Sequence, residues 1–205
     1  MDVLFPPYEP NRSKYHPRST KTMINALPTA DGWGPLPKLA AFSNAMPEAP
    51  AGAILVRRQD TDAFVIYSGG QNDLYRLNSA TDNFDEISKS ADVYSCPVGE
   101  NWSFEPFGTT LLAANVSDPM QFVNIDSTDD FADVTAHADT DQPVPQARFL
   151  KQFGVQLAAL NTNLGANVLQ LSGFGNYNWW QPRELGADFQ EFKGGGPGRD
   201  LAHRP

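Results

Sequence analysis

A repeat of about 46 residues, beginning at residue 53, constrains the fold of this chain more than any other feature of the sequence. Three tripeptides lie 46 residues apart in succession: Tyr67-Ser68-Gly69, Ala113-Ala114-Asn115 and Ala159-Leu160-Asn161. The pair Phe107-Gly108 recurs after 46 residues as Phe153-Gly154. Aromatic residues near the unit ends are 47 and 48 residues apart: Phe84, Phe131 and Trp179. Such a period is typical of supersecondary units that must stack to bury their apolar faces.

Each repeat unit divides into four short apolar segments separated by turn-forming residues. They cover residues 53–57, 63–68, 74–77 and 84–87 in the first unit, 102–107, 110–115, 121–125 and 131–134 in the second, and 148–153, 156–161, 168–171 and 179–180 in the third. These short segments fit strands, and no window of a dozen residues shows a helical period. The sequence therefore predicts an all-β, β-propeller-like fold with about three four-stranded antiparallel blades, in units 53–88, 102–135 and 147–181.

Three blades predict an incomplete propeller. Closed propellers typically have four or more blades, and a blade face left in water would be an unusually large exposed apolar patch for a monomer. The two open faces therefore need another set of strands, another domain or another subunit to cover them.

Composition agrees with an all-β reading and gives no sign of a membrane segment. Hydrophobic residues make up 40% of the 205 residues, which is enough for a core, and 16 glycines with 17 prolines favour turns and short strands. The chain contains no run of 18 apolar residues, and residues 1–7 lack a charged segment followed by an apolar one. We expect neither a membrane anchor nor a signal peptide.

The flanks of the repeat differ from it in composition. Residues 1–50 hold nine of the 17 prolines, which predicts an extended Pro-rich arm with turns before a blade domain at 51–192. A basic cluster in this arm is either a solvated surface or a contact for an acidic partner: Arg12, Lys14, Arg18 and Lys21. Residues 193–205 predict a Gly-rich flexible tail that is disordered or docked on a neighbour.

The formal net charge of −9 is unevenly distributed. Residues 1–50 carry five Lys or Arg against four Asp or Glu, whereas residues 51–205 carry ten against twenty. Because affinity for nucleic acid comes mainly from Lys and Arg, this balance argues against a sequence-reading DNA binder. We expect contact with DNA to be repulsive or incidental.

The residues that support nucleophilic catalysis are few and scattered. A triad needs a Ser or Cys, a His and a carboxylate held together by the fold, and the histidines fall in the arm, an inter-unit loop and the tail: His16, His137 and His203. The single cysteine, Cys96, predicts a buried small apolar side chain. The sequence therefore gives no catalytic residue, and we expect no enzymatic activity.

Two pairs of acidic residues keep open the alternative of a glycan hydrolase. Such enzymes use paired carboxylates, and the candidates are Glu100 with Glu105 and Asp129 with Asp130. All four fall in loops or edge positions, where acidic side chains are ordinarily solvated. The large aromatic residues are more typical of a blade core than of a base-stacking platform, because basic residues do not interleave them: Trp102, Phe104, Phe107, Phe131, Phe153 and Trp179.

Motifs for metal or phosphate binding are incomplete. Residues 126–130, Asp-Ser-Thr-Asp-Asp, could offer oxygens to Ca²⁺, but they lack the Gly and terminal Glu of a helix-loop-helix calcium site. Gly194-Gly195-Gly196 lacks the Lys and Ser or Thr that follow in a phosphate-binding loop. We expect no cofactor and no metal.

A resemblance to a known family rests on residues 25–37, 102–108, 114–121, 180–182 and 188–191. These segments resemble the propeller-containing tail proteins of short-tailed phages, in particular the nozzle or packaged-DNA stabilisation protein family, and the resemblance covers roughly residues 5–192. Members of that family continue past the Gly-rich point with further blades, which this sequence does not show.

The resemblance implies a place in the virion. Several copies would form a ring beneath the portal and adaptor, after assembly in the host cytoplasm, and would close the channel that retains packaged DNA. It also implies contacts with fibre or spike proteins, and it supplies no catalytic residues. An acidic wall suits a conduit because it repels phosphate. The sequence thus favours a structural tail component, with a tail-associated glycan hydrolase and a receptor- or fibre-binding module as alternatives.

Overall fold

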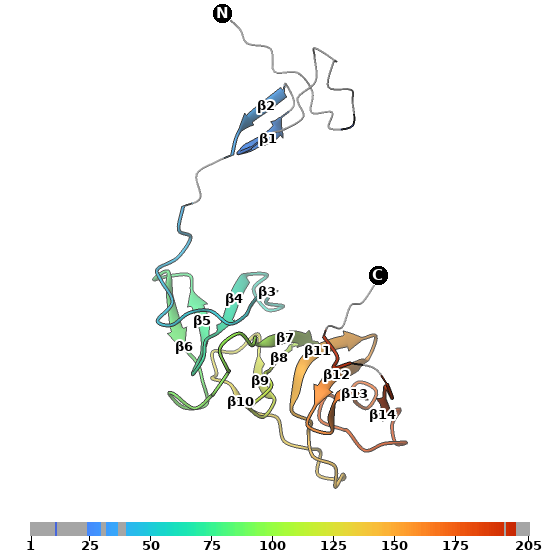
Figure 1. Cartoon of the computed structure of the whole chain (residues 1–205). Coiled ribbons are helices and arrows are strands. Elements are labelled where there is room, and N and C mark those ends of the chain that lie inside the picture. The colour runs from blue at the N-terminus through green and yellow to red at the C-terminus, as the bar shows by residue number, and fades with distance from the viewer. Residues whose placement is uncertain (1–10, 12–23, 30–31, 37–39, 195, 200–205) are drawn as a thin grey trace, which may run out of the picture. The chain divides into compact units, whose positions relative to one another are not determined.

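The computed structural model describes residues 11, 24–29, 32–36, 40–194 and 196–199 (Figure 1). These residues form fourteen strands and no helix. The strands make three four-stranded antiparallel sheets and one two-stranded sheet, none of which closes into a barrel. The all-β, propeller-like fold that the repeat predicts is therefore confirmed. Within the same residues, no helix is long and apolar enough to span a bilayer.

The chain divides into two compact units after Phe42. In the first unit, β1 (Ala26–Thr29) and β2 (Gly32–Pro35) pair as an antiparallel hairpin. The N–H of Leu36 donates to the Asn25 carbonyl at 2.8 Å and extends this pairing. The segment expected to be an extended arm therefore contains a hairpin. The second unit begins at Ser43, eight residues before the boundary that the proline content suggests.

The second unit holds the three repeated sheets, and each sheet follows chain order from its first strand to its last. The first sheet comprises β3 (Ala53–Arg57), β4 (Phe64–Gly69), β5 (Leu74–Asn78) and β6 (Asn83–Glu86). The second comprises β7 (Ser103–Phe107), β8 (Thr110–Ala114), β9 (Gln121–Asn124) and β10 (Ala132–Asp133). The third comprises β11 (Ala147–Phe153), β12 (Gln156–Thr162), β13 (Gly165–Leu171) and β14 (Asp188–Glu191).

In the second and third sheets, a tight turn joins the first strand to the second. Phe107 pairs with Thr110, and Phe153 pairs with Gln156, so two residues join the strands in each case. The first turn residue is Gly108 at φ +62° in one and Gly154 at φ +60° in the other. A backbone with positive φ at that position suits glycine, which explains why the Phe-Gly pair recurs with the repeat.

Eleven of the twelve segments expected to be strands overlap strands of the structure. The exception is the last, because residues 179–180 lie in the connection between β13 and β14. Trp180 packs in the core between the second and third sheets, and the Trp179 side chain lies against Gly173. Strand β14 instead pairs Val168 with Glu191. The two tryptophans are buried in a connecting segment, so the prediction of a strand at residues 179–180 is wrong.

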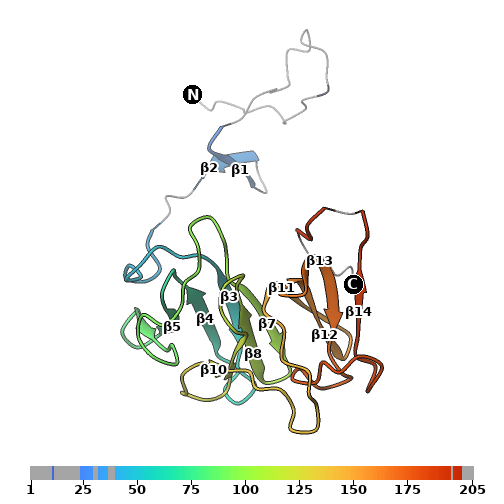
Figure 2. The ribbon, with the colours of Figure 1, turned by 60° about the horizontal axis from the view of Figure 1, so that its bottom comes forward.

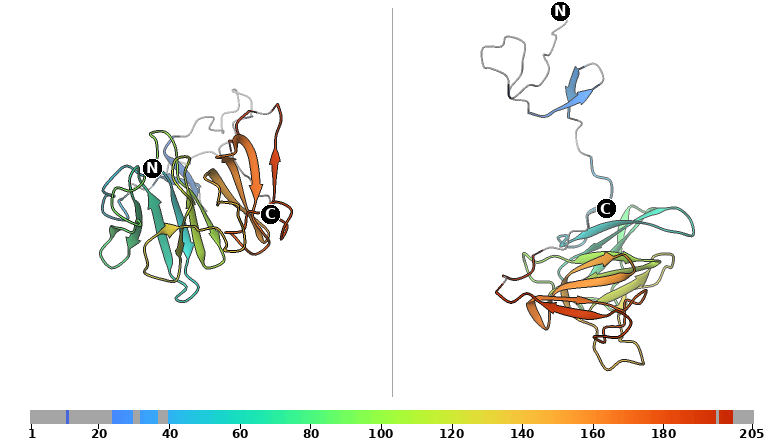
Figure 3. Two further views of the ribbon diagram at one scale, coloured as in Figure 1. Left: turned by 90° about the horizontal axis from the view of Figure 1, so that it is seen from below. Right: turned by 90° about the vertical axis from the view of Figure 1, so that its right-hand side faces the viewer.

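The second sheet lies between the first and the third (Figure 3). The core consists of two clusters, one on each side of the second sheet. In β8, Leu111 and Ala113 face the first sheet, whereas Leu112 and Ala114 face the third. Successive side chains of a strand point to opposite faces. The continuous apolar run of β8 is therefore explained by a sheet that is covered on both sides.

The first strands of the three sheets lie next to one another (Figure 2). Strand β7 contacts both β3 and β11. The N–H of Leu150 in β11 donates to Ser103 Oγ in β7 at 2.9 Å, and the N–H of Trp102 donates to the Ala51 carbonyl at 2.8 Å. Sheets that meet at their first strands and fan outward are arranged as propeller blades.

Part of the Gly-rich tail lies against the third sheet. The N–H of Gly198 donates to the Ala166 carbonyl at 2.7 Å, and Asn161 Nδ2 donates to the Gly198 carbonyl at 3.2 Å. Glycine is required there, because a Cβ at 198 would lie 2.5 Å from Leu160 Cγ. The prediction of a flexible tail is therefore wrong for residues 196–199, which dock on their own chain.

Candidate functional site

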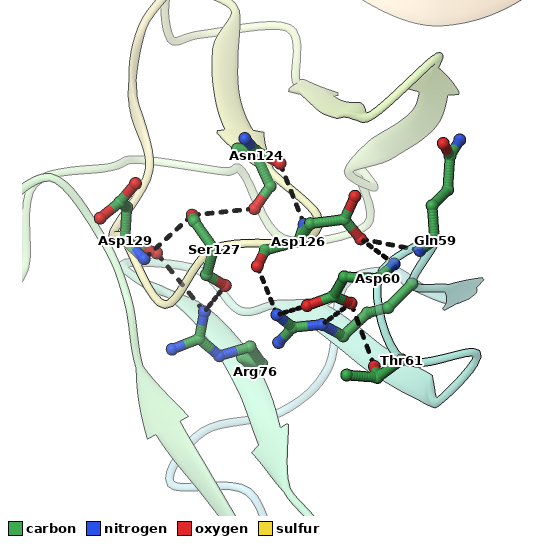
Figure 4. Close-up of polar contacts among 9 residues, drawn as sticks. Gln59, Asp60, Thr61, Arg76, Asn124, Asp126, Ser127 and Asp129 are labelled. Atoms are coloured by element: carbon green, nitrogen blue, oxygen red, sulfur yellow. Dashed lines mark hydrogen bonds and ion pairs between the residues drawn. The ribbon is translucent and has the colours of Figure 1, made fainter.

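The most developed polar cluster of the described residues joins the first and second sheets at the loop after β9 (Figure 4). Side chains fix the shape of this loop from within. The N–H of Asp126 donates to Asn124 Oδ1 at 3.0 Å, Ser127 Oγ donates to the Asn124 carbonyl at 3.0 Å, and the N–H of Asp129 donates to Ser127 Oγ at 3.1 Å. Such local side-chain bonds are typical of Asx and Ser turns, and here they turn the loop carbonyls toward the first sheet.

The guanidinium of Arg76, in β5, donates hydrogen bonds to these carbonyls. It donates to Ser127 O at 3.4 Å, to Thr128 O at 3.2 Å and to Asp129 O at 3.5 Å. Carbonyl oxygens of this kind are also ligands for Ca²⁺. In this loop the cation that they meet is the arginine of the neighbouring sheet. No group of three or more His, Cys, Asp or Glu side chains is arranged for a metal ion within the described part of the chain.

A second arginine, in the β3–β4 turn, contacts the same loop. Arg58 binds Asp60 through two bonds of 3.0 Å and also donates to the Asp126 carbonyl. The hydrogen bond from Arg58 lowers the pKa of the Asp60 carboxyl below its usual value. Asp126 Oδ1 accepts the backbone N–H of Gln59 at 2.8 Å. The cluster therefore holds the first and second sheets together, and its role is structural.

One of the two carboxylate pairs that could serve a glycan hydrolase, Glu100 with Glu105, contacts the third sheet. Glu105 is only 7% exposed, and it accepts from Lys151 Nζ at 3.1 Å and from the N–H of Gln152 at 3.0 Å. The Glu100 carboxylate lies 2.7 Å from a guanidinium nitrogen of Arg148. The expectation that all four acidic candidates are solvated is wrong for Glu105, because β11 packs against β7 and covers it. Asp129 and Asp130 are exposed.

The remaining reactive side chains occupy unrelated places. His137 lies in the connection between the second and third sheets, where its Nδ1 accepts the N–H of Asp139 at 3.3 Å and its ring lies 5.0 Å from that of Trp179. Cys96 is buried, as the sequence predicts, and burial raises the pKa of its thiol. His16 and His203 lie outside the described residues.

The basic cluster of the arm also lies outside the described residues. It comprises Arg12, Lys14, Arg18 and Lys21. Its role as a partner contact stays a prediction.

A carboxylate that the sequence analysis missed closes the β4–β5 turn. Glu48 accepts the backbone N–H groups of Gln71 at 2.9 Å and of Asp73 at 3.0 Å, and the hydroxyl of Tyr75 at 3.2 Å. A Cβ at Gly70 would lie 2.0 Å from its carboxylate. No motif signals this arrangement, because Glu48 lies in the Pro-rich segment, more than twenty residues before the turn that it caps.

The aromatic residues expected to form the core do so with one exception. Trp102, Phe104, Phe131 and Trp179 are buried, and Phe107 packs against the cluster between the second and third sheets. Phe153, at the position that corresponds to Phe107, is 38% exposed. Its sheet is the last of the three, so within the described residues no further sheet packs over it, and its assignment to the core is wrong.

Two apolar sheet faces lie on the outer sides of the first and third sheets. The first outer face is formed by residues that alternate with those of the inner core, and its members are Leu55, Phe64, Ile66, Leu77 and Phe84. The third outer face is defined in the same way, and its members are Phe149, Phe153, Leu160, Leu169 and Leu171. Both faces keep large apolar side chains partly in water.

The third outer face is hollowed beside β14. A pocket of about 220 Å³ is lined by residues of β13 and β14: Leu169, Leu171, Asp188, Phe189 and Gln190. The segment at 196–199 covers Leu160 at the other side of the face. The third outer face is therefore accessible to solvent beside β13 and β14.

Comparison with protein-family models and with curated protein sequences gave no match for this chain.

Proposed function

We propose that this protein is a structural component of a bacteriophage tail, a subunit of the nozzle or channel-closing ring beneath the portal and adaptor. The proposal rests on the resemblance of residues 25–37, 102–108 and 114–121 to tail proteins of short-tailed phages, and on an all-β fold of repeated sheets. In this role the protein retains packaged DNA and helps its ejection. It acts through contacts with other protein chains and has no catalytic step.

The observation that carries the proposal is the pair of outer faces. Leu55 and Phe64 are 58% and 66% exposed on the first sheet, and Phe153 is 38% exposed on the third. Exposed apolar patches on soluble proteins mark interaction sites. Two such faces on opposite ends of one stack of sheets suit a subunit that is built into a larger assembly.

The use of the polar clusters supports an assembly role over hydrolysis. Glu100 and Glu105 each meet a cation of the third sheet, and the loop at 126–130 is bound by Arg76 and Arg58. These contacts hold one sheet to the next. The acidic balance of residues 51–205 supports a conduit for DNA, since a wall of like charge disfavours adhesion of phosphate.

The test uses phage particles produced with and without the N-terminal arm. The protein should be found in purified particles in a fixed ratio to the portal. Deletion of residues 1–24 should leave the purified protein folded but abolish its incorporation. Replacing Arg12, Lys14, Arg18 and Lys21 together by Ala should weaken incorporation, and the difference from the wild-type protein should shrink at high ionic strength, because salt screens the exposed charge attraction in the wild-type protein.

Neutralising Lys193 and Arg183 serves as the matched control, since these exposed basic residues lie outside the arm. Particles that lack the protein altogether, or a protein without residues 1–24 that incorporates normally, would contradict the proposal and its account of the arm respectively.

A further inference from the structure

A pocket with two arginines lies where the segment at 196–199 docks on the third sheet. Its volume is about 400 Å³, and it is lined by Arg148 and Phe149 of β11 and by Pro197 and Arg199 of the docked segment. Sites for small ligands usually have volumes of about 300–1,000 Å³, so this pocket is large enough for one. It shares no lining residue with the pocket beside β14.

The backbone of Gly198 fixes one wall of this pocket. Its N–H donates to the Ala166 carbonyl at 2.7 Å, and its carbonyl accepts a hydrogen bond from Asn161 Nδ2 at 3.2 Å. A Cβ at 198 would lie 2.5 Å from Leu160 Cγ, so the segment lies directly on the sheet. Arg199 follows this anchored residue, and the docking of Gly198 therefore brings Arg199 to the pocket.

Two neighbours hold the guanidinium of Arg148 at the other wall. Its Nη2 lies 2.7 Å from Glu100 Oε2, and its Cζ lies 5.4 Å from the centre of the Phe149 ring. A cation at this distance is attracted to the face of an aromatic ring. The Arg148 side chain is still 34% exposed. Because a guanidinium carries five N–H donors, the contact with Glu100 leaves donors for a ligand in the pocket.

The charges around the pocket leave one positive charge without a partner. Glu100 pairs with Arg148, whereas Arg199 is exposed and forms no ion pair with a carboxylate of the described residues. This surplus is local, because residues 51–205 together hold ten Lys or Arg against twenty Asp or Glu. A ligand with a single negative charge balances the site. A dianion would also be repelled by the nearby Glu100 carboxylate.

We propose that this pocket binds a small carboxylic acid with an apolar or aromatic body. The fork of N–H groups on a guanidinium matches the two oxygens of a carboxylate, and Arg148 and Arg199 supply two such groups. The Phe149 ring and Pro197 supply apolar surface beside them. The carboxylate of the ligand contacts the arginines, and its apolar body packs against Phe149. This site does not depend on a role in a phage tail.

The test is isothermal titration calorimetry of the full chain with phenylacetate. The expected result is saturable binding to one site per chain, with a dissociation constant of about 1–5 mM. Two further probes separate the two parts of the recognition. Phenylacetamide lacks the charge and acetate lacks the aromatic body, so each should bind about tenfold more weakly or less tightly still. Inorganic phosphate should not displace phenylacetate at equal concentration.

Variants of the docked segment locate the binding. Arg199→Ala should weaken phenylacetate binding by about tenfold or more, whereas Lys193→Ala, the matched control at an exposed basic residue outside the pocket, should not change it. Gly198→Val adds a Cβ against Leu160 and should weaken binding as Arg199→Ala does, because the segment is displaced. Urea unfolding shows whether each variant is folded. No saturable binding to the wild-type protein, binding that survives either Arg199→Ala or Gly198→Val, or displacement by phosphate would overturn the proposal.

Discussion

The indole Nε1 of Trp102 donates a hydrogen bond of 2.8 Å to the carbonyl oxygen of Gly70, so a residue at the start of the second sheet closes a turn of the first. The same ring packs against Gly69, where a Cβ would come within 2.3 Å of Trp102 Cδ1. Because the indole fills this space and satisfies a buried carbonyl, Trp102 joins the first sheet to the second.

Replacing Trp102 by Ala should lower the free energy of unfolding by roughly 3–5 kcal/mol, since a large buried ring is removed and a cavity remains. Trp102→Phe keeps much of the packing and loses the hydrogen bond to Gly70, so its effect should be smaller, at about 1–3 kcal/mol. Urea unfolding followed by circular dichroism measures both. A loss below about 1 kcal/mol for Trp102→Ala would show that the ring contributes little to the packing of the two sheets.

Glu48→Gln should destabilise the second unit by about 1–3 kcal/mol, because a charged acceptor of backbone N–H groups at Gln71 and Asp73 becomes neutral. The same measurement on Glu184→Gln provides the control, as Glu184 is an exposed acid in the connection before β14. Equal effects of the two substitutions would mean that the β4–β5 turn does not depend on this carboxylate.

Arg76→Ala should cost about 1–2 kcal/mol, because it leaves the carbonyls of residues 127–129 without their donor. Arg57→Ala is the matched control: Arg57 pairs with Asp62 at 2.9 Å, but both side chains are largely exposed, so its loss should cost less than about 1 kcal/mol. Thermal unfolding of both variants separates the two kinds of contact. A larger loss of stability for Arg57→Ala than for Arg76→Ala would contradict the conclusion that this loop holds the first and second sheets together.

Stability should fall as the pH rises above about 10, the usual pKa of tyrosine in an unfolded chain. Burial raises the pKa of Tyr67, Tyr75 and Tyr94 in the folded protein. Below the unfolded pKa both states are protonated and the stability is complete. Above it only the unfolded state loses protons, so unfolding is favoured by up to about 1.4 kcal/mol per pH unit for each tyrosine.

The variant Tyr94→Phe isolates one of these contributions. Its urea midpoint should depend less steeply on pH between about 9 and 11 than that of the wild-type protein. Other groups that titrate in this range are common to both proteins. An unchanged slope would show that the Tyr94 hydroxyl ionises alike in the folded and unfolded states.

The sequence was sufficient to predict most strands, because turn residues and short apolar segments recur with the period of the fold. Phe107-Gly108 and Phe153-Gly154 mark two equivalent turns, and the apolar run in β8 marks a sheet covered on both sides. The strand predicted at Trp179 and Trp180 is wrong, because apolar residues indicate burial and not the type of element. A buried connecting segment and a buried strand have the same apolar content.

The candidate sites were less predictable, because they depend on which sheet packs over which. Glu105 is buried by strand β11, whose first residue lies 42 positions later in the chain. Glu48 caps a turn from a segment without a motif. Phe153 repeats the pattern of Phe107 but lies on the last sheet. A repeat predicts equivalent positions within each unit, whereas exposure also depends on the place of the unit in the stack.

The measurement that tests the central claim most directly is the extent to which a maleimide labels Leu55→Cys in the free protein and in purified phage particles. Cys96 contributes little, because its thiol is buried and its pKa is raised. If the first outer face is covered by a neighbouring chain of the tail, Leu55→Cys should react in the free protein and be protected in the particles. Equal labelling of Leu55→Cys in both would contradict the account.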